Sequence, residues 1–317
     1  MINVLLLAAG FAALIYGANI LVDSASSLAR RLNVPDMVIG LTIVAFGTSS
    51  PELVVNLFAS LRHNSDMALG NVIGSNIFNI LAILGISAVI RPLEVRNTTT
   101  WIEIPLSLLA ALAVYFMAGD VLFDRADGNL ISRVDGIILL LFFMVFMAYN
   151  VAVIKGNREE QKIEIRDYTV TKSVLLIIAG LVLLAVGGRM IVVSATDIAR
   201  MIGISEKVIA LTIVSVGTSL PELATSVVAA RKKNLDIAIG NVVGSNIFNL
   251  FFILGISAVI YPVSIPGGLQ LDLYFNILAS LLLFIFVFTG RGRRLERWEG
   301  AIFLLLYTGF VTGLIIM

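Results

Sequence analysis

The stretch GTSSPEL, residues 47–53, decides the fold, because it puts a proline and a glutamate into the middle of an apolar segment. The residues before it read MVIGLTIVAF, and those after it read VVNLFASL. Proline removes one backbone hydrogen bond from a helix and pushes aside the carbonyl group four residues earlier, here that of Gly47. We therefore expect a helix that is broken beside Glu52.

The composition of the whole chain predicts an integral membrane protein. Of the 317 residues, 59% are hydrophobic and 14% are charged, which is far from the balance of a water-soluble globular protein. The net charge of +1 argues against nucleic-acid binding, which needs a concentrated basic surface. The absence of cysteine excludes disulfides and thiolate metal ligands.

Internal self-similarity divides the chain into two halves. Residues 38–92 align with 208–262 at a constant offset of 170, without a gap, and 34 of the 55 positions are identical. GTSSPEL aligns with GTSLPEL at 217–223, and GNVIGSNIFN at 70–79 aligns with GNVVGSNIFN at 240–249. Within one membrane domain, we predict a first repeat at 1–154, a linker at 155–172 and a second repeat at 173–317.

Apolar stretches of about 20 residues predict ten membrane-spanning helices. They lie near 2–29, 37–61, 67–90, 101–118, 134–154, 173–199, 207–230, 237–260, 271–289 and 298–316. Their continuously apolar character excludes the alternating strands of a membrane barrel. Because each repeat holds an odd number of spans, the second repeat must enter the membrane upside down. The predicted fold class is therefore an all-α integral membrane protein with two inverted five-helix repeats and with helices broken at the midplane.

The distribution of basic residues predicts the orientation in the membrane. When the connections are assigned alternately to two sides, those of one side carry sixteen lysines and arginines and those of the other carry five. Cytoplasmic connections carry the excess of basic residues in membrane proteins. We expect a multi-pass protein of the cell membrane with both termini outside and the linker in the cytoplasm. Arg189 lies inside the sixth span, where we expect it to snorkel or to pair locally.

Oxygen-bearing side chains gather around the two predicted helix breaks at helical spacing. They are Thr48, Glu52, Asn56, Asn71, Ser75 and Asn79 in the first half, and Thr218, Glu222, Ser226, Asn241, Ser245 and Asn249 in the second. A carboxylate at mid-membrane costs about 2.5 to 3.5 kcal/mol, so each glutamate needs a compensating charge. Six or more oxygens without nearby histidine or cysteine predict a site for a hard cation, either Ca²⁺ or Na⁺. For Asn71 and Asn241, binding the helices together is the alternative role.

These motifs carry a resemblance to a known family. The pair GTSSPEL and GTSLPEL, each followed by G-N-x-x-G-S-N-I-F-N, resembles the paired repeats of the sodium/calcium exchanger family, within the cation/calcium exchanger superfamily. The likeness covers essentially the whole chain and is that of a ten-helix, prokaryotic-type member. It implies that Glu52 and Glu222 are the central carboxylates shared by Ca²⁺ and Na⁺. The further ligands that it implies are Thr48, Ser49, Thr218, Ser219, Ser75, Ser245, Asn79 and Asn249.

The resemblance implies an antiporter that exports Ca²⁺ from the cytoplasm in exchange for Na⁺ by alternating access, with the first and sixth spans sliding across a rigid core. The chain departs from the family in one respect. Many sodium/calcium exchangers carry an aspartate at one of the positions of Asn79 and Asn249, whereas proton-coupled relatives tend toward asparagine. A Ca²⁺/H⁺ antiporter on the same fold is therefore the alternative.

Two other functional classes fit the sequence less well. A passive cation channel would also contain broken helices, but one pseudo-symmetric site within a single chain suits a carrier better. An enzyme is not expected. A hydrolase could use the two glutamates as acid and base, but the sequence contains neither an H-E-x-x-H nor a G-x-S-x-G motif. We expect no cofactor, and no partner besides the transported ions and the lipid bilayer.

Overall fold

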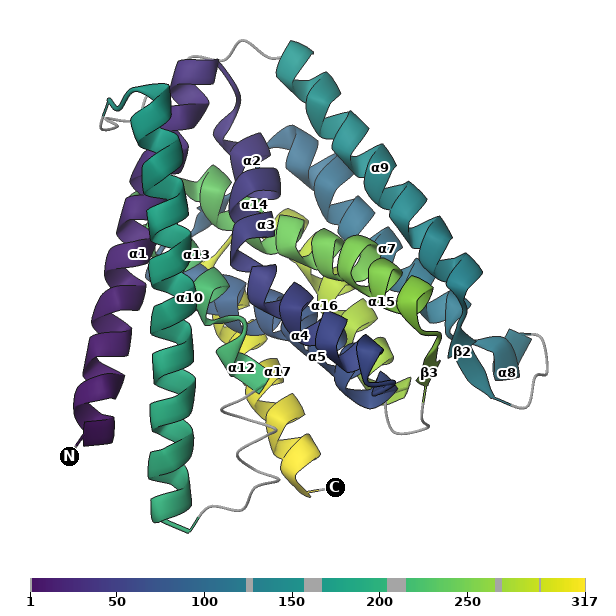
Figure 1. Cartoon of the computed structure of the whole chain (residues 1–317). Coiled ribbons are helices and arrows are strands. Elements are labelled where there is room, and N and C mark those ends of the chain that lie inside the picture. Colours follow the sequence, from purple (N-terminus) through teal and green to yellow (C-terminus); the bar gives the residue numbers. More distant parts are fainter. Residues whose placement is uncertain are drawn as a thin grey trace.

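The computed structural model describes residues 2–123, 128–156, 167–203, 215–265, 270–290 and 292–316. Over these residues the chain forms a bundle of helices, and four short strands join some of the connections (Figure 1). The predicted all-α architecture is confirmed at this level.

The elements of the two halves follow one another in a similar order. The first half contains α1 (Ile2–Leu32), α2 (Asp36–Ile39), the π-helix η1 (Gly40–Val44), α3 (Ala45–Thr48), α4 (Ser50–Leu61), α5 (Ser65–Ile77), the π-helix η2 (Phe78–Leu84), α6 (Gly85–Ile90), β1 (Leu93–Glu94), the π-helix η3 (Thr99–Glu103), α7 (Ile104–Met117), α8 (Asp120–Phe123), β2 (Asn129–Ile131) and α9 (Arg133–Gly156). The second half contains α10 (Val170–Met201), α12 (Ser215–Gly217), α13 (Leu220–Arg231), α14 (Leu235–Ile247), the π-helix η5 (Phe248–Ile253), α15 (Leu254–Ile260), β3 (Val263–Ile265), α16 (Gln270–Thr289), β4 (Arg294–Leu295) and α17 (Arg297–Ile316).

Seven helices of the described residues are long and apolar enough to cross a membrane. An eighth follows if the bent pair 36–48 and 50–61 is counted as one span. The predicted seventh span, 207–230, lies partly outside the described residues, and α17 occupies the position of the predicted tenth span. The total of ten spans and the inversion of the second repeat stay predictions.

The predicted helix break is present in the first half. The segments on either side of Ser49 are bent by 48°, and Ser49 itself has left the helical conformation, with φ −80° and ψ 6°. Pro51 lies in the first turn of α4, where a helix leaves its N–H groups unpaired in any case, so the proline begins a new helix. In the second half, Thr218 and Ser219 separate α12 from α13, and Pro221 again lies in the first turn.

The two long helices α1 and α10 pack along each other at one side of the molecule (Figure 1). Glycines make this close contact possible. A Cβ atom on Gly17 would lie 2.9 Å from the carbonyl oxygen of Gly180, and a Cβ atom on Gly187 would lie 2.8 Å from that of Gly10. Small residues let helix backbones approach closely in membranes, and here a larger residue would collide with the neighbouring backbone.

Burial distinguishes a core from a periphery. The buried fraction was compared over an apolar window of 18 residues in each helix. It is 78% for 65–90 and for 235–260, but only 28% for α1 and 33% for α10. The core is therefore formed by the two continuous helices α5–η2–α6 and α14–η5–α15, which carry the G-N-x-x-G-S-N-I-F-N motifs. The helices α1 and α10 cover this core from outside.

The strands pair connections that are far apart in the sequence. β1 pairs with β4, and β2 pairs with β3, both antiparallel. β1 follows the third predicted span and β4 the ninth, whereas β2 follows the fourth and β3 the eighth. Each pairing therefore joins two connections that the alternating assignment puts on the same side of the membrane.

Candidate functional site

The two motif glutamates are buried, and each is bonded to the other half of the chain. Glu52 and Glu222 are both 1% exposed. The hydroxyl of Ser219 donates to Oε1 of Glu52, and that of Ser49 donates to Oε1 of Glu222, each over 2.9 Å. Because both serines lie at the helix breaks, the break of each half supplies the donor for the carboxylate of the other half. The two motifs thus meet in one site.

The following helix in the first half adds a second hydroxyl to this site. Ser75 Oγ lies 3.0 Å from Ser219 Oγ and 3.5 Å from Oε1 of Glu52. Ser245, the equivalent of Ser75, is likewise buried. Hydroxyl groups that donate their hydrogen to a carboxylate keep their oxygen lone pairs free for a further contact.

The two motif threonines contact amides of the opposite half. Thr48 Oγ1 donates to Oδ1 of Asn241 over 3.0 Å, and Thr218 Oγ1 lies 3.5 Å from Oδ1 of Asn71. The sequence spacing suggested that Thr48 lies on the same helical face as Glu52. The helix is broken at Ser49, however, so Thr48 and Glu52 belong to different helices and do not share a face.

Asn71 and Asn241 hold the broken helices in place. Their Nδ2 atoms donate to the backbone oxygens of the glutamates of their own halves, over 3.4 and 3.3 Å. The same Nδ2 atoms donate to Asn56 Oδ1 over 2.6 Å and to Ser226 Oγ over 2.9 Å. Of the two roles considered for these amides, the structure shows the one that binds helices together.

Five buried oxygens of the site have no hydrogen-bond partner among the described residues. They are Glu52 Oε2, Glu222 Oε2, Asn79 Oδ1, Asn249 Oδ1 and Ser245 Oγ. Leaving a buried acceptor unpaired costs about 1 to 3 kcal/mol, and more for a charged group, so such a group needs a compensating partner. A proton can neutralise a carboxylate, but an amide oxygen is not protonated near neutral pH. The two amide oxygens therefore favour a metal cation.

The chemistry of the donors limits which cation fits. The described residues contain no group of three or more histidine, cysteine, aspartate or glutamate side chains placed to hold a metal ion. The site combines two carboxylates with neutral hydroxyl and amide oxygens. Such an all-oxygen set suits Ca²⁺ or Na⁺, whereas zinc sites are built mainly on cysteine and histidine.

Two residues of the site were missed by reasoning from the sequence. Asn76 accepts a hydrogen bond of 2.9 Å from Asn249, and Asn246 accepts one of 3.0 Å from Asn79. Both lie in the quoted motif G-S-N-I-F-N, three residues before the predicted ligands. Residues three apart lie on the same face of a helix, and this spacing was the available signal.

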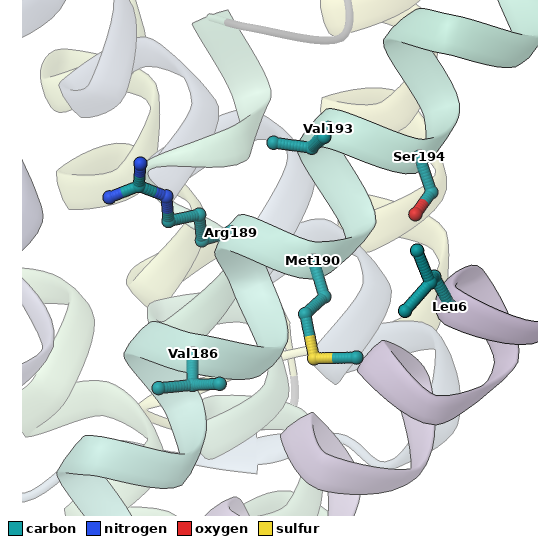
Figure 2. Close-up of a pocket in the computed structure, with 6 residues that line it drawn as sticks. All are labelled: Leu6, Val186, Arg189, Met190, Val193 and Ser194. Atoms are coloured by element: carbon teal, nitrogen blue, oxygen red, sulfur yellow. The ribbon is translucent and has the colours of Figure 1, made fainter. Parts of the chain in front are cut away.

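A separate pocket lies between α10 and α1. It has a volume of about 250 Å³ and is lined by Leu6, Val186, Arg189, Met190, Val193 and Ser194. Figure 2 shows that Met190 and Ser194 point toward Leu6 of α1, whereas the guanidinium group of Arg189 points away from it. None of the ten predicted ligands lines this pocket, so it is distinct from the site of the two glutamates.

Comparison with known proteins identifies the family. The family model described as sodium/calcium exchanger protein matches residues 2–152 and 172–316. The chain belongs to the sodium/calcium exchanger family. The membership expected from the motifs is confirmed, and the chain is thus a multi-pass membrane protein of a family of transporters.

Relatives of this exchanger family resemble the chain over nearly its whole length. A putative antiporter, CaxA, of Alkalimonas amylolytica is 38% identical over 95% of both chains. The sodium/calcium exchanger MaX1 of Methanosarcina acetivorans is 31% identical over 99% of this chain and 98% of its own. The solved structure of the sodium-calcium exchanger NCX_Mj soaked with 2.5 mM Na⁺ and 0.1 mM Ca²⁺ matches with a TM-score of 0.84 and 33% identity, over 98% of each chain.

Proposed function

We propose that this exchanger exports Ca²⁺ from the cytoplasm in exchange for Na⁺ by alternating access. The observation that carries the proposal is the reciprocal bonding of Glu52 and Glu222 to the serines of the opposite halves. It creates one buried site at which two carboxylates need a cation. The names of MaX1 and NCX_Mj, both sodium/calcium exchangers, support the same pair of ions.

The proposed ion ligands are the two glutamates and the oxygens that surround them. Glu52 and Glu222 are the central carboxylates, and their unpaired Oε2 atoms support this role. The unpaired Oδ1 atoms of Asn79 and Asn249 support amide ligation. The remaining proposed ligands are Thr48, Ser49, Ser75, Thr218, Ser219 and Ser245.

Alternating access follows from two inverted repeats of five spans each, in which α1 and α10 slide across the core. The 34 identities at a constant offset of 170 support the repeat. The peripheral position of α1 and α10, and their glycine contacts with each other, support a movement of these two helices as a pair. Inverted repeats with broken helices at a midplane site are a common design of secondary transporters.

The proposed direction of transport rests on the orientation in the membrane. We place both termini outside and the linker 155–172 in the cytoplasm. The connections on the proposed cytoplasmic side carry sixteen basic residues and those on the other side carry five, which supports this orientation. The pairing of β1 with β4 and of β2 with β3 supports the alternation of sides on which the count depends.

Coupling to protons is the second candidate, and the neutrality of Asn79 and Asn249 favours it. With two glutamates, the site has a formal charge of −2, which one Ca²⁺, two Na⁺ or two H⁺ would cancel. A third Na⁺ would move one net positive charge in each cycle, which is worth about 2.3 kcal/mol for each 100 mV of membrane potential. Dependence on the membrane potential therefore reports the stoichiometry.

Transport of calcium-45 in proteoliposomes tests the proposal when the sodium and pH gradients are varied separately. We expect a sodium gradient to drive uptake at constant pH. Uptake driven by a pH gradient in the complete absence of sodium would establish the proton-coupled alternative. In a carrier, unlabelled Ca²⁺ on one side drives labelled Ca²⁺ from the other side against its own gradient. The absence of this counterflow would contradict a carrier and favour a channel.

A further inference from the structure

Four asparagines form two pairs of side-chain amides, and each pair joins the two halves of the site. Asn76 on α5 and Asn246 on α14 are 0% and 2% exposed. Asn249 Nδ2 donates to Asn76 Oδ1 over 2.9 Å, and Asn79 Nδ2 donates to Asn246 Oδ1 over 3.0 Å. Each proposed ligand amide is thus bonded through its nitrogen to an asparagine of the opposite half.

The orientation of Asn76 is fixed by a group that can only accept hydrogen bonds. Asn76 Nδ2 donates to the backbone carbonyl oxygen of Asn246 over 3.3 Å. An amide side chain has one end that donates and one that accepts. Because the donating end of Asn76 faces this carbonyl, its accepting end, Oδ1, is left to face Asn249.

The fixed orientation of Asn76 in turn determines that of Asn249. Only the Nδ2 end of Asn249 can bond to Asn76 Oδ1, so Asn249 Oδ1 must point in the other direction. This oxygen is buried and has no hydrogen-bond partner among the described residues. A reversed Asn249 amide would bring two oxygens together and would present N–H groups, which cations do not bind, to the site.

We propose that Asn76 is a positioning residue that turns Asn249 so that its Oδ1 faces the transported cation, and that Asn246 does the same for Asn79. The inference rests on the proposed function and deepens it. It also accounts for the amide at position 249. A carboxylate there would set an oxygen against Asn76 Oδ1, while Asn76 is held by the backbone of Asn246. The site therefore keeps two acidic charges.

Equilibrium binding of calcium-45 to the purified protein tests this role without requiring transport. Partners that orient metal ligands typically contribute 10- to 100-fold to metal affinity, so we expect Asn76→Ala to weaken Ca²⁺ binding by about tenfold or more. Asn150→Ala is the matched control. Asn150 is also a buried asparagine, but its Nδ2 donates to Phe146 O within its own helix α9, and its removal should leave the affinity unchanged.

A double-mutant cycle separates positioning from a general structural effect. If Asn76 acts through Asn249, then adding Asn76→Ala to Asn249→Ala causes no further loss of Ca²⁺ affinity. Losses that multiply in the double variant would overturn the inference, as would an Asn76→Ala protein with the affinity of the wild type. If Asn76→Ala is not recovered folded, the same cycle with Asn246→Ala and Asn79→Ala decides the question in the other half.

The binding assay also distinguishes this inference from the proposed function. A folded wild-type protein that binds no Ca²⁺ would overturn the proposed function itself. If the wild-type protein binds Ca²⁺ but the losses of affinity multiply in both double variants, only the positioning roles of Asn76 and Asn246 are overturned.

Discussion

Ser49 donates a hydrogen bond of 2.9 Å to Glu222, a residue 173 positions further along the chain. Ser219 donates a bond of the same length to Glu52, so the contact occurs twice with the halves exchanged. Both serines lie between two helices, where the backbone has left the helical path. The hydroxyl groups can therefore reach across to the other half. This exchange of donors makes a single site out of two copies of one motif.

Removing either serine hydroxyl should weaken Ca²⁺ binding. A hydrogen bond to a charged group contributes about 1.5 to 3 kcal/mol, and 1.4 kcal/mol corresponds to a factor of ten. We expect Ser49→Ala and Ser219→Ala to lower the Ca²⁺ affinity by about tenfold each in equilibrium binding. Ser60→Ala is the control, because Ser60 is a buried serine on α4 whose hydroxyl has no hydrogen-bond partner among the described residues. Unchanged affinity in both site variants would contradict the ligand assignment.

Neutralising either central carboxylate should abolish transport. Glu52→Gln and Glu222→Gln keep the size of the side chain but each remove one of the two negative charges that we propose as cation ligands. We expect calcium-45 uptake at the level of protein-free liposomes for both variants. Glu94→Gln serves as the control, because Glu94 is exposed on strand β1, away from the site. Transport at the wild-type rate by Glu52→Gln would refute the site.

Adding one methyl group at the contact between α1 and α10 should destabilise the protein. A Cβ atom on Gly187 would lie 2.8 Å from the carbonyl oxygen of Gly10, and backbone atoms cannot move aside easily. Overpacking of this kind costs about 1 to 3 kcal/mol. We expect Gly187→Ala to lower the apparent melting temperature in detergent. Gly309→Ala on α17 should not, because a Cβ atom there meets nothing within 4 Å. Equal melting temperatures would show that the two helices are not so closely packed.

Single cysteines should report the orientation of the chain, which contains no natural cysteine. Arg62 and Arg30 are both exposed and lie in connections assigned to opposite sides of the membrane. In intact cells, a membrane-impermeant maleimide should label Arg62→Cys, whereas Arg30→Cys should react only after the membrane is permeabilised. The reverse pattern would invert the proposed orientation and with it the direction of Ca²⁺ transport.

Features that depend on a local pattern were predictable from the sequence. Continuous apolar stretches predicted the long helices, and Pro51 predicted the break, because proline affects only its own turn of helix. The exact place of the break was less predictable. It lies at Ser49, so Thr48 faces Asn241 of the other half and does not continue the face of Glu52. The neighbouring residues alone do not decide to which side a non-helical turn directs its side chains.

The sequence by itself determined that the chain lies in a membrane and that its two halves repeat one motif, and it predicted that Glu52 and Glu222 need a cation. These conclusions follow from composition, self-similarity and the cost of a charge in an apolar medium, none of which requires coordinates. Only the tertiary structure decided which atoms meet. The exchange of serine donors and the amide contacts of Asn76 and Asn246 join residues 167 to 173 positions apart. Such contacts arise when whole helices pack, and the direction of each amide is set by its neighbour in the other half.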